Sequence, residues 1–206
     1  MIKFSDADKA RIREAIRAAE KNTSGEFVAV VARASDHYIF LPLLWAAFLA
    51  LILPGILYFA AAPLAWMHLY QIQLAVFVVL ALLFLFVPEL HLHLVPRHVK
   101  HSRASRLAKA QFYLQGVHTT REHSGVLFFV SLAEHYVEIV ADSGIHEKLG
   151  AAHWRGIVDQ FVTEVGQGKV VDGFVAAISA CGAAMAKHYP PEPGNPDELY
   201  NGLIEI

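Results

Sequence analysis

Three acidic residues stand at the predicted ends of strands, where carboxylates could meet. Glu26 begins the apolar run Glu26–Ala32, Glu134 lies in the short connection after a second apolar run, and Asp142 ends a third. If the three converge, their oxygens could hold Ca²⁺ or Mg²⁺, which prefer oxygen ligands. Arg121, just before the second run, is a further candidate site residue. In the alternative interpretation Glu134 and Glu138 are solvated, while Asp142 and Arg121 form ion pairs or cap turns.

The sequence contains no established nucleophile motif. Cys181 is the single cysteine, falls in an apolar helical stretch and lacks the arginine of a cysteine-phosphatase loop. A Gly-rich phosphate loop and a nucleophile elbow are also missing. One cysteine excludes an intrachain disulfide, and a net charge of −2 gives no indication of a nucleic-acid partner.

Twelve histidines are many for a chain of 206 residues. His91 and His93 lie beside an apolar run, and His98 and His101 are three apart, a spacing that places them on one face of a helix. They could form a metal site or a pH-sensitive membrane contact, since histidine gains its charge near pH 6.5. In the alternative interpretation they are ordinary polar groups at a membrane interface.

Two apolar runs between residues 39 and 90 predict a helical hairpin that crosses a membrane. The first, Ile39–Ala62, contains no ionisable residue and would form a helix about 36 Å long, enough to cross a bilayer. The second, Leu69–Leu90, has polar residues only near its ends, and PLAWMH forms the predicted turn between the runs. The alternative is a hairpin buried in a soluble core, but 206 residues are too few to wrap two such helices.

The positive charges predict the orientation of this hairpin. All 17 Lys and Arg lie outside residues 39–90, with Arg33 before the hairpin and a basic run Arg97–Lys109 after it. By the positive-inside rule, both termini lie in the cytoplasm. The basic run would determine this topology and contact lipid headgroups.

Residues 1–38 and 91–189 are predicted to form one α/β domain, a small mixed sheet with helices on both faces. The second and third strands have so short a connection that they should pair antiparallel. The basic helix should carry Leu107, Ala110 and Leu114 on one face. Residues 190–206 are Pro-rich and predict an irregular tail. The predicted strands are Glu26–Ala32, Gly125–Ser131 and Tyr136–Asp142, and the predicted helices run from Ser5 to Lys21, His98 to Gln115, Lys148 to Val165 and Val171 to Lys187.

Four stretches carry a resemblance to a known family: Thr23–Val31, Thr119–Val130, Ala133–Ile145 and Gly173-Phe-Val. Together with the order of elements, they resemble the TPM domain family, and in particular its bacterial subgroup with two membrane helices inserted after the first strand. The sequence departs from the family at two places. His123-Ser124 replaces an acidic or amide residue, and Ala141-Asp-Ser-Gly replaces a Gly-rich turn.

The resemblance implies a TPM-like fold in a two-pass protein of the bacterial inner membrane. Some relatives are described as accessory factors for membrane complexes, and others as acid phosphatases or divalent-metal binders. We therefore expect a binding or accessory factor whose partners are the lipid bilayer and other membrane proteins. The alternative is a weak divalent-metal-dependent phosphatase that uses Glu26, Glu134 and Asp142 around Ca²⁺ or Mg²⁺.

Overall fold

The computed structural model describes residues 4–38, 40–60, 65–86, 95–145, 151–191 and 198–206. They form two compact units, one of Met1–Ser35 with His101–Ile206 and one of Asp36–Lys100. We call the first the α/β unit and the second the hairpin unit. The α/β unit is assembled from two stretches of chain separated by the whole hairpin unit.

A four-stranded mixed sheet forms the centre of the α/β unit, in the order β3-β2-β1-β4. β1 (Glu26–Ala32) pairs parallel with β2 (Gly125–Ser131), and β2 pairs antiparallel with β3 (Tyr136–Ala141). These three strands confirm the predicted ones to within a residue. Every residue of β1 and β2 is buried, which explains why both strands are apolar along nearly their whole length.

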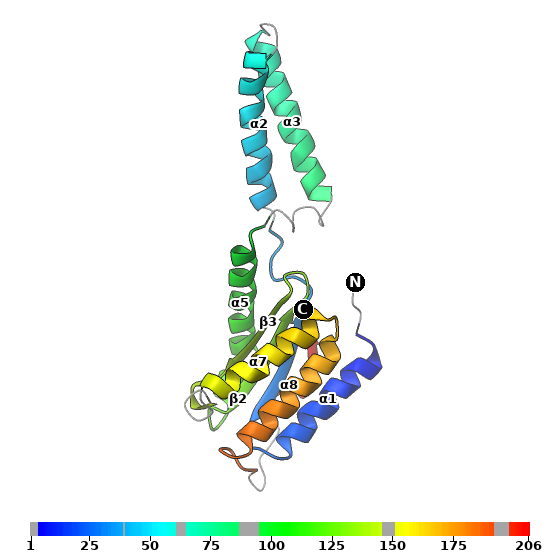
Figure 1. Cartoon of the computed structure of the whole chain (residues 1–206), viewed down its shortest axis with the longest axis vertical. Coiled ribbons are helices and arrows are strands. Elements are labelled where there is room, and N and C mark those ends of the chain that lie inside the picture. Colours follow the sequence, from blue (N-terminus) through cyan, green and yellow to red (C-terminus); the bar gives the residue numbers. More distant parts are fainter. Residues whose placement is uncertain (1–3, 39, 61–64, 87–94, 146–150, 192–197) are drawn as a thin grey trace. The chain divides into compact units, whose positions relative to one another are not determined.

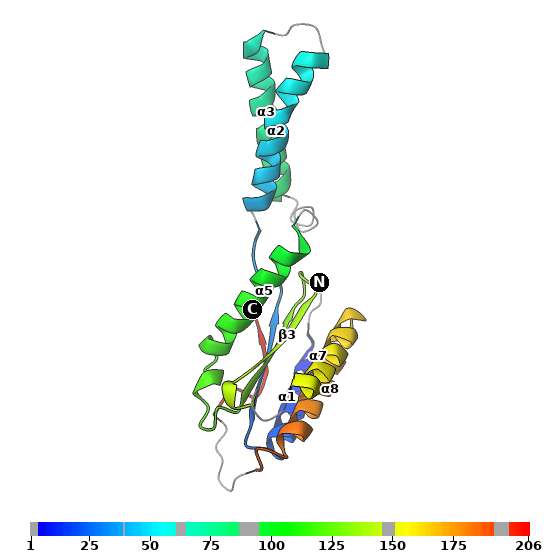
Figure 2. The ribbon, with the colours of Figure 1, turned by 60° about the vertical axis from the view of Figure 1, so that its left-hand side comes forward.

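Three helices cover one face of the sheet (Figures 1 and 2). They are α1 (Asp6–Glu20), α7 (Ala151–Gly166) and α8 (Val170–Met185). A chain of aromatic rings fills this side of the core: Phe128 lies 6.2 Å from Phe27 and from Phe161, and Phe161 lies 5.1 Å from Phe174, all between ring centroids. Ser5 and Asp8 form a capping box at the start of α1.

One helix, α5 (Arg97–Leu114), packs on the other face, so the prediction of helices on both faces is confirmed. The three residues of the predicted apolar face do not share one environment: Leu107 packs against the sheet, whereas Ala110 and Leu114 are exposed, Leu114 by 74%. The buried side is centred on Ala104, Ala108 and Phe112, and the small alanines allow the helix to approach the sheet closely. α5 gives way to a short 3-10 turn, η1 (Val117–Thr119), after Gly116, whose φ of 71° favours glycine.

The end of the predicted irregular tail is a strand, so that prediction was wrong. β4 (Leu203–Glu205) pairs parallel with β1 and closes the sheet on that side. The Arg33 amide donates to the Ile206 carbonyl at 2.9 Å, and the Ile206 amide donates to the Val31 carbonyl at 2.9 Å. An apolar run this short is too weak a signal in sequence. It becomes a strand because the edge of β1 has backbone groups that need partners.

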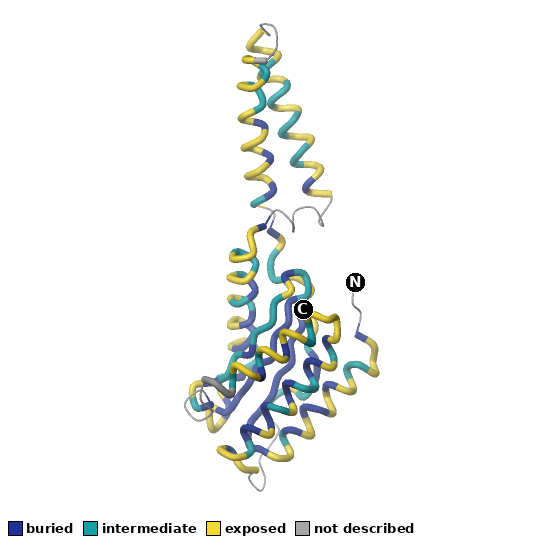
Figure 3. Tube along the Cα trace, viewed as in Figure 1, coloured by how far each residue is buried: buried dark blue, intermediate teal, exposed yellow. Residues whose placement is uncertain are grey.

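The hairpin unit contains two helices that pack against each other, α2 (Phe40–Ala60) and α3 (Trp66–Phe86). Both are long and apolar enough to cross a membrane. In the most apolar 18 residues of each helix, only 17% of the residues of α2 and 6% of those of α3 are buried. This low burial contradicts the alternative of a hairpin inside a soluble core. Figure 3 shows this exposure along both helices. α3 begins at Trp66, so part of the predicted turn is helical; residues 61–64 lie outside the described residues.

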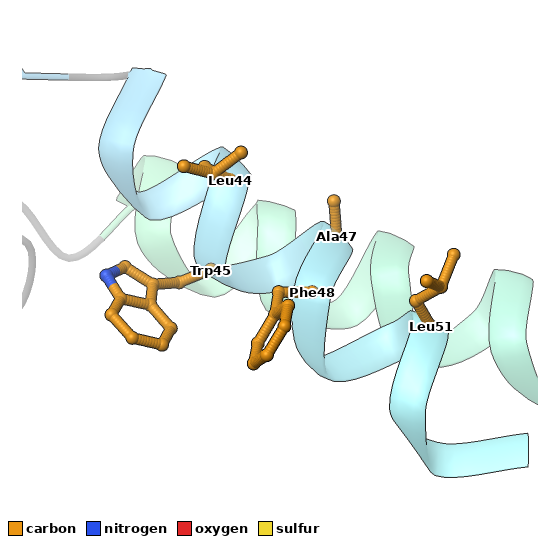
Figure 4. A pocket seen from close by; sticks show the side chains of 5 residues that line it. All are labelled: Leu44, Trp45, Ala47, Phe48 and Leu51. Carbon is orange, nitrogen blue, oxygen red and sulfur yellow. The ribbon is translucent and has the colours of Figure 1, made fainter. Parts of the chain in front are cut away.

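A shallow apolar hollow on α2 shows the character of this surface. It is lined by Leu44, Trp45, Ala47, Phe48 and Leu51, with Trp45 and Phe48 in an edge-to-face contact at 6.0 Å (Figure 4). Apolar side chains exposed at this density are typical of a lipid-facing helix.

Candidate functional site

The strand pairing brings the residues before β1 and β2 to one end of the sheet. Glu26 is the register partner of Gly125, because β1 and β2 are parallel and begin together. β3 runs the other way, so its last residue, Ala141, pairs with Val126. Asp142 therefore lies at the same end of the sheet as Glu26, and its amide donates to the Gly125 carbonyl at 3.0 Å.

A small hollow at this end, which we call the strand-start site, is lined mainly by oxygen-bearing side chains. Its lining residues are Ser24, Glu26, Thr120, Arg121, Glu122, Ser124 and Glu198. Glu26 is only 3% exposed, and a carboxylate so deeply buried needs donors or a cation around it to remain ionised. The site thus combines carboxylates and hydroxyls, the oxygen ligands that Ca²⁺ and Mg²⁺ prefer.

Hydrogen bonds hold the rim of the strand-start site together. The Ser24 hydroxyl donates to Oε2 of Glu122 at 2.9 Å, and the Ser124 hydroxyl donates to the Ser24 carbonyl at 3.2 Å. The Arg121 amide donates to Oε2 of Glu198 at 3.1 Å. The site is therefore built from three stretches distant in sequence: the turn before β1, the turn before β2 and the C-terminal segment.

Asp142 orients a histidine beside this site. Its Oδ1 accepts the Ser143 amide at 2.6 Å, and its Oδ2 lies 3.2 Å from Nδ1 of His123. The prediction that Asp142 pairs or caps a turn is confirmed. His123 adopts a φ of 50°, which is uncommon for a residue other than glycine. Its side chain is 64% exposed, so the other ring nitrogen can meet solutes.

Glu134 lies at the opposite end of the sheet, so the three predicted carboxylates do not converge. It follows β2, about 20 Å from Glu26 at the rise of a strand. The Ser35 amide donates to its Oε1 at 2.9 Å, and the Ser131 hydroxyl donates to its Oε2. Glu134 is 4% exposed, so the alternative that it is solvated is wrong as well. It ties the end of β1 to the turn between β2 and β3.

The predicted histidine candidates are placed only in part. His91 and His93 lie outside the described residues. His98 and His101 lie exposed on α5, and the His101 ring contacts the Tyr136 ring in a tilted arrangement, with 5.2 Å between centroids. No group of three or more His, Cys, Asp or Glu side chains within the described ranges is arranged to hold a metal ion. Metal binding therefore stays a prediction.

Tyr136 and Cys181, both away from the strand-start site, have raised pKa values. Burial, followed by the nearby Glu138 carboxylate, raises the pKa of Tyr136 to about 12. The Tyr136 hydroxyl donates to Oε2 of Glu138 at 3.1 Å. Burial in the core also raises the pKa of the Cys181 thiol well above its usual range, which makes it a poor nucleophile.

Sequence reasoning missed Glu122, Ser24 and Glu198. The first two could have been found, because parallel strands of equal length that start together also bring together the residues just before them. Glu198 gives no such signal, because it comes from the C-terminal segment, whose path depends on β4.

The comparisons with known proteins agree with this architecture. A family model described as TPM domain matches residues 88–184, which span α5, β2, β3, α7 and nearly all of α8. The chain is also similar to the NMR structure of the BA42 protein from the psychrophilic bacterium Bizionia argentinensis. That similarity has a TM-score of 0.62 at 18% sequence identity and covers 100% of this chain and 97% of the other. No curated protein sequence matches this chain. The similarity to the BA42 structure shows a shared fold, and the family model shows that this chain carries a TPM domain, matched over residues 88–184.

Proposed function

We propose that this is a two-pass protein of the bacterial inner membrane whose TPM domain acts in the cytoplasm as a binding or accessory factor for other membrane proteins. The observation that carries the proposal is the pairing of β1 with β2 along all seven residues. These strands flank the hairpin unit in sequence and belong to one sheet. The inserted segment must therefore leave and return on the same side of a bilayer, which two crossing helices achieve.

The charge distribution supports the cytoplasmic side. Lys and Arg are absent from α2 and α3 and from the chain between them, while Arg33 and Arg97 flank the pair. Positive residues next to short membrane segments are retained in the cytoplasm. The exposed apolar surface of α2 and α3 supports burial of both helices in lipid.

Labelling of single cysteines tests this topology. The native Cys181 is fully buried, so it should remain unlabelled in the folded protein. We expect a membrane-impermeant maleimide to label Ala65→Cys in intact spheroplasts. Glu14→Cys on α1 and Lys109→Cys on α5 should react only after lysis. Labelling of Glu14→Cys from outside would contradict the proposed orientation.

Site-specific photo-cross-linking tests the binding role. A photoreactive residue is placed at exposed positions of the α/β unit in native membranes, and the adducts are identified. We expect a discrete adduct with another membrane protein. The adduct should persist when residues 40–86 are replaced by an unrelated two-span hairpin, because the TPM domain is the binding part. Adducts with lipid alone from every position would contradict the accessory role.

The second candidate is a weak phosphatase dependent on a divalent cation, and the oxygen-rich lining of the strand-start site favours it. In this version Glu26 is the central ligand and Glu134 takes no part, since it lies at the other end of the sheet. Calorimetric titration with Ca²⁺ and Mg²⁺, paired with a phosphomonoester assay, tests it. Binding and turnover should be lost in Glu26→Gln and retained in Glu14→Gln, a matched change on the surface of α1. If the titrations show no heat of binding and the assay shows no turnover, this candidate is eliminated.

A further inference from the structure

The charge of α5 differs from that of the rest of the chain. The helix has 18 residues and carries five of the chain's 17 cationic residues but none of its 19 acidic ones. These cations are Arg97, Lys100, Arg103, Arg106 and Lys109. A helix with one sign of charge over about 27 Å presents an extended field rather than a single ion-pairing site.

The packing of α5 determines which of its residues reach solvent. Ala104, Ala108, Gln111 and Phe112 face the sheet and are buried. The opposite side exposes what we call the outer face of α5, which consists of Ser102, Arg106, Lys109, Ala110, Tyr113 and Leu114. Among the described residues, neither Arg106 nor Lys109 pairs with an acidic side chain. Both charges are therefore available to a ligand outside the α/β unit.

The outer face also carries exposed apolar groups at its C-terminal end. Tyr113 is 63% exposed and Leu114 is 74% exposed, beside the two cations. Cationic side chains next to an aromatic and an aliphatic residue are typical of helices that lie in the headgroup region of a bilayer. A soluble partner with a few acidic residues would match the cations but leave this apolar end uncovered.

We propose that the outer face of α5 binds the anionic phospholipid headgroups of the membrane in which the hairpin is embedded. The inference rests on the membrane anchoring proposed above. α5 is the first described helix after α3, which ends at Phe86, and it begins at Arg97. A cluster of four to eight basic residues directly after a membrane helix is a recurrent signal for anionic lipid. Arg106 and Lys109 contact phosphate, while Tyr113 and Leu114 enter the interface.

The test uses the full-length protein in nanodiscs of phosphatidylcholine, with or without phosphatidylglycerol. A spin label at Tyr113→Cys reports accessibility to oxygen, which partitions into lipid, and to a polar nickel reagent, which stays in water. We expect the oxygen-to-nickel ratio to rise at least about twofold with phosphatidylglycerol, because the label enters the interface. The rise should disappear in 1 M salt, which cuts the screening length from about 8 to about 3 Å.

Two double variants form the matched comparison. Arg106→Gln with Lys109→Gln should abolish the response to phosphatidylglycerol. Arg13→Gln with Arg17→Gln removes two exposed cations from α1, on the other side of the sheet, and should leave the response unchanged. Thermal unfolding of both should match that of the parent protein, because all four side chains are exposed.

An equal ratio in the two lipid compositions would overturn the proposal, as would an undiminished rise in the Arg106 and Lys109 variant. A response to added RNA or acidic peptide in place of anionic lipid would also overturn it. A second label, at Phe48→Cys on α2, separates this failure from failure of the anchoring itself. That label should be accessible to oxygen in both nanodiscs if the hairpin spans the bilayer, whatever α5 does.

Discussion

Glu134 and Glu26 are both buried carboxylates, yet their surroundings give them different tasks. Glu134 accepts the Ser35 amide and the Ser131 hydroxyl, so it connects the end of β1 to the hairpin of β2 and β3. Glu26 begins β1 in a hollow shared with Glu122 and Glu198. The hydrogen bonds of Glu134 lie within the fold, whereas Glu26 lines a small hollow. A stability role for Glu134 follows.

We expect Glu134→Gln to lower the free energy of unfolding of the α/β unit by about 1–3 kcal/mol, because a neutral amide with one acceptor oxygen replaces a charged acceptor of two hydrogen bonds. Denaturant unfolding followed by circular dichroism measures the change. Glu14→Gln, an exposed change on α1, should have almost no effect. Equal stability of the two variants would contradict the assigned role.

Tyr136 should make the protein sensitive to alkali. Its pKa in the folded state is raised to about 12, above the usual 10, mainly by burial. The folded state therefore holds this proton more tightly, so the contribution is full below pH 10 and is lost as the pH rises toward 12. We expect Tyr136→Phe to show a shallower loss of stability over this range than the parent protein. Parallel unfolding curves for the two proteins between pH 9 and pH 12 would refute this assignment.

At the scale of elements, α5 on one face and β4 at one edge complete the sheet. One face is covered by α5 with Val117 and Leu199 beside it, and three residues of β4 cover part of the edge of β1. β1 is apolar and fully buried, so an open edge would offer other chains a template for pairing. The C-terminal residues thus protect the strand that leads directly into the hairpin unit.

Removing residues 203–206 should destabilise the α/β unit and promote aggregation. Leu203 is 7% exposed, and loss of its burial alone costs about 2 kcal/mol, to which the lost backbone hydrogen bonds add. Thermal unfolding and size-exclusion chromatography measure both effects. Glu205→Gln is the control, because it removes only the exposed ion pair with Lys9 at 2.6 Å and should change little. A truncated protein as stable as this control would show that β4 is dispensable.

At the scale of the whole molecule, the hairpin unit is an insertion into a domain that has its own core. The hydrophobic clusters on the two faces of the sheet draw all their residues from the α/β unit. Folding of this unit therefore requires only that its two stretches of chain stay joined. A long insertion between them costs little in loop-closure entropy.

Replacement of residues 36–100 by a linker of about ten Gly and Ser residues should therefore give a soluble, cooperatively folded α/β domain. Heteronuclear NMR spectra with dispersed amide signals, together with a single sharp unfolding transition, would be the expected result. A control with the same linker and an added Phe128→Asp substitution should fail to fold, because Phe128 is fully buried. An aggregated or unfolded product from the unmodified linker protein would mean that the hairpin unit is needed for folding.

Much of this protein could be predicted from local patterns. Local sequence predicts the strands β1 and β2 and the two apolar helices, because an element that is apolar on all sides needs an unbroken apolar run. The antiparallel pairing of β2 with β3 follows from the short connection between them. The likeness to TPM domains also lies in these local stretches.

Tertiary structure alone decided three other features. The side on which α5 faces the sheet is set by contacts with the strands, which bury Ala104, Ala108 and Phe112 and leave Leu114 exposed. β4 forms because β1 has an unpaired edge, a demand that arises far from residues 203–205 in sequence. Glu26 and Glu134 look alike as acids at the ends of strands, but only the register of the sheet shows that they lie at opposite ends. Each depends on contacts between distant segments, so no local pattern contains it.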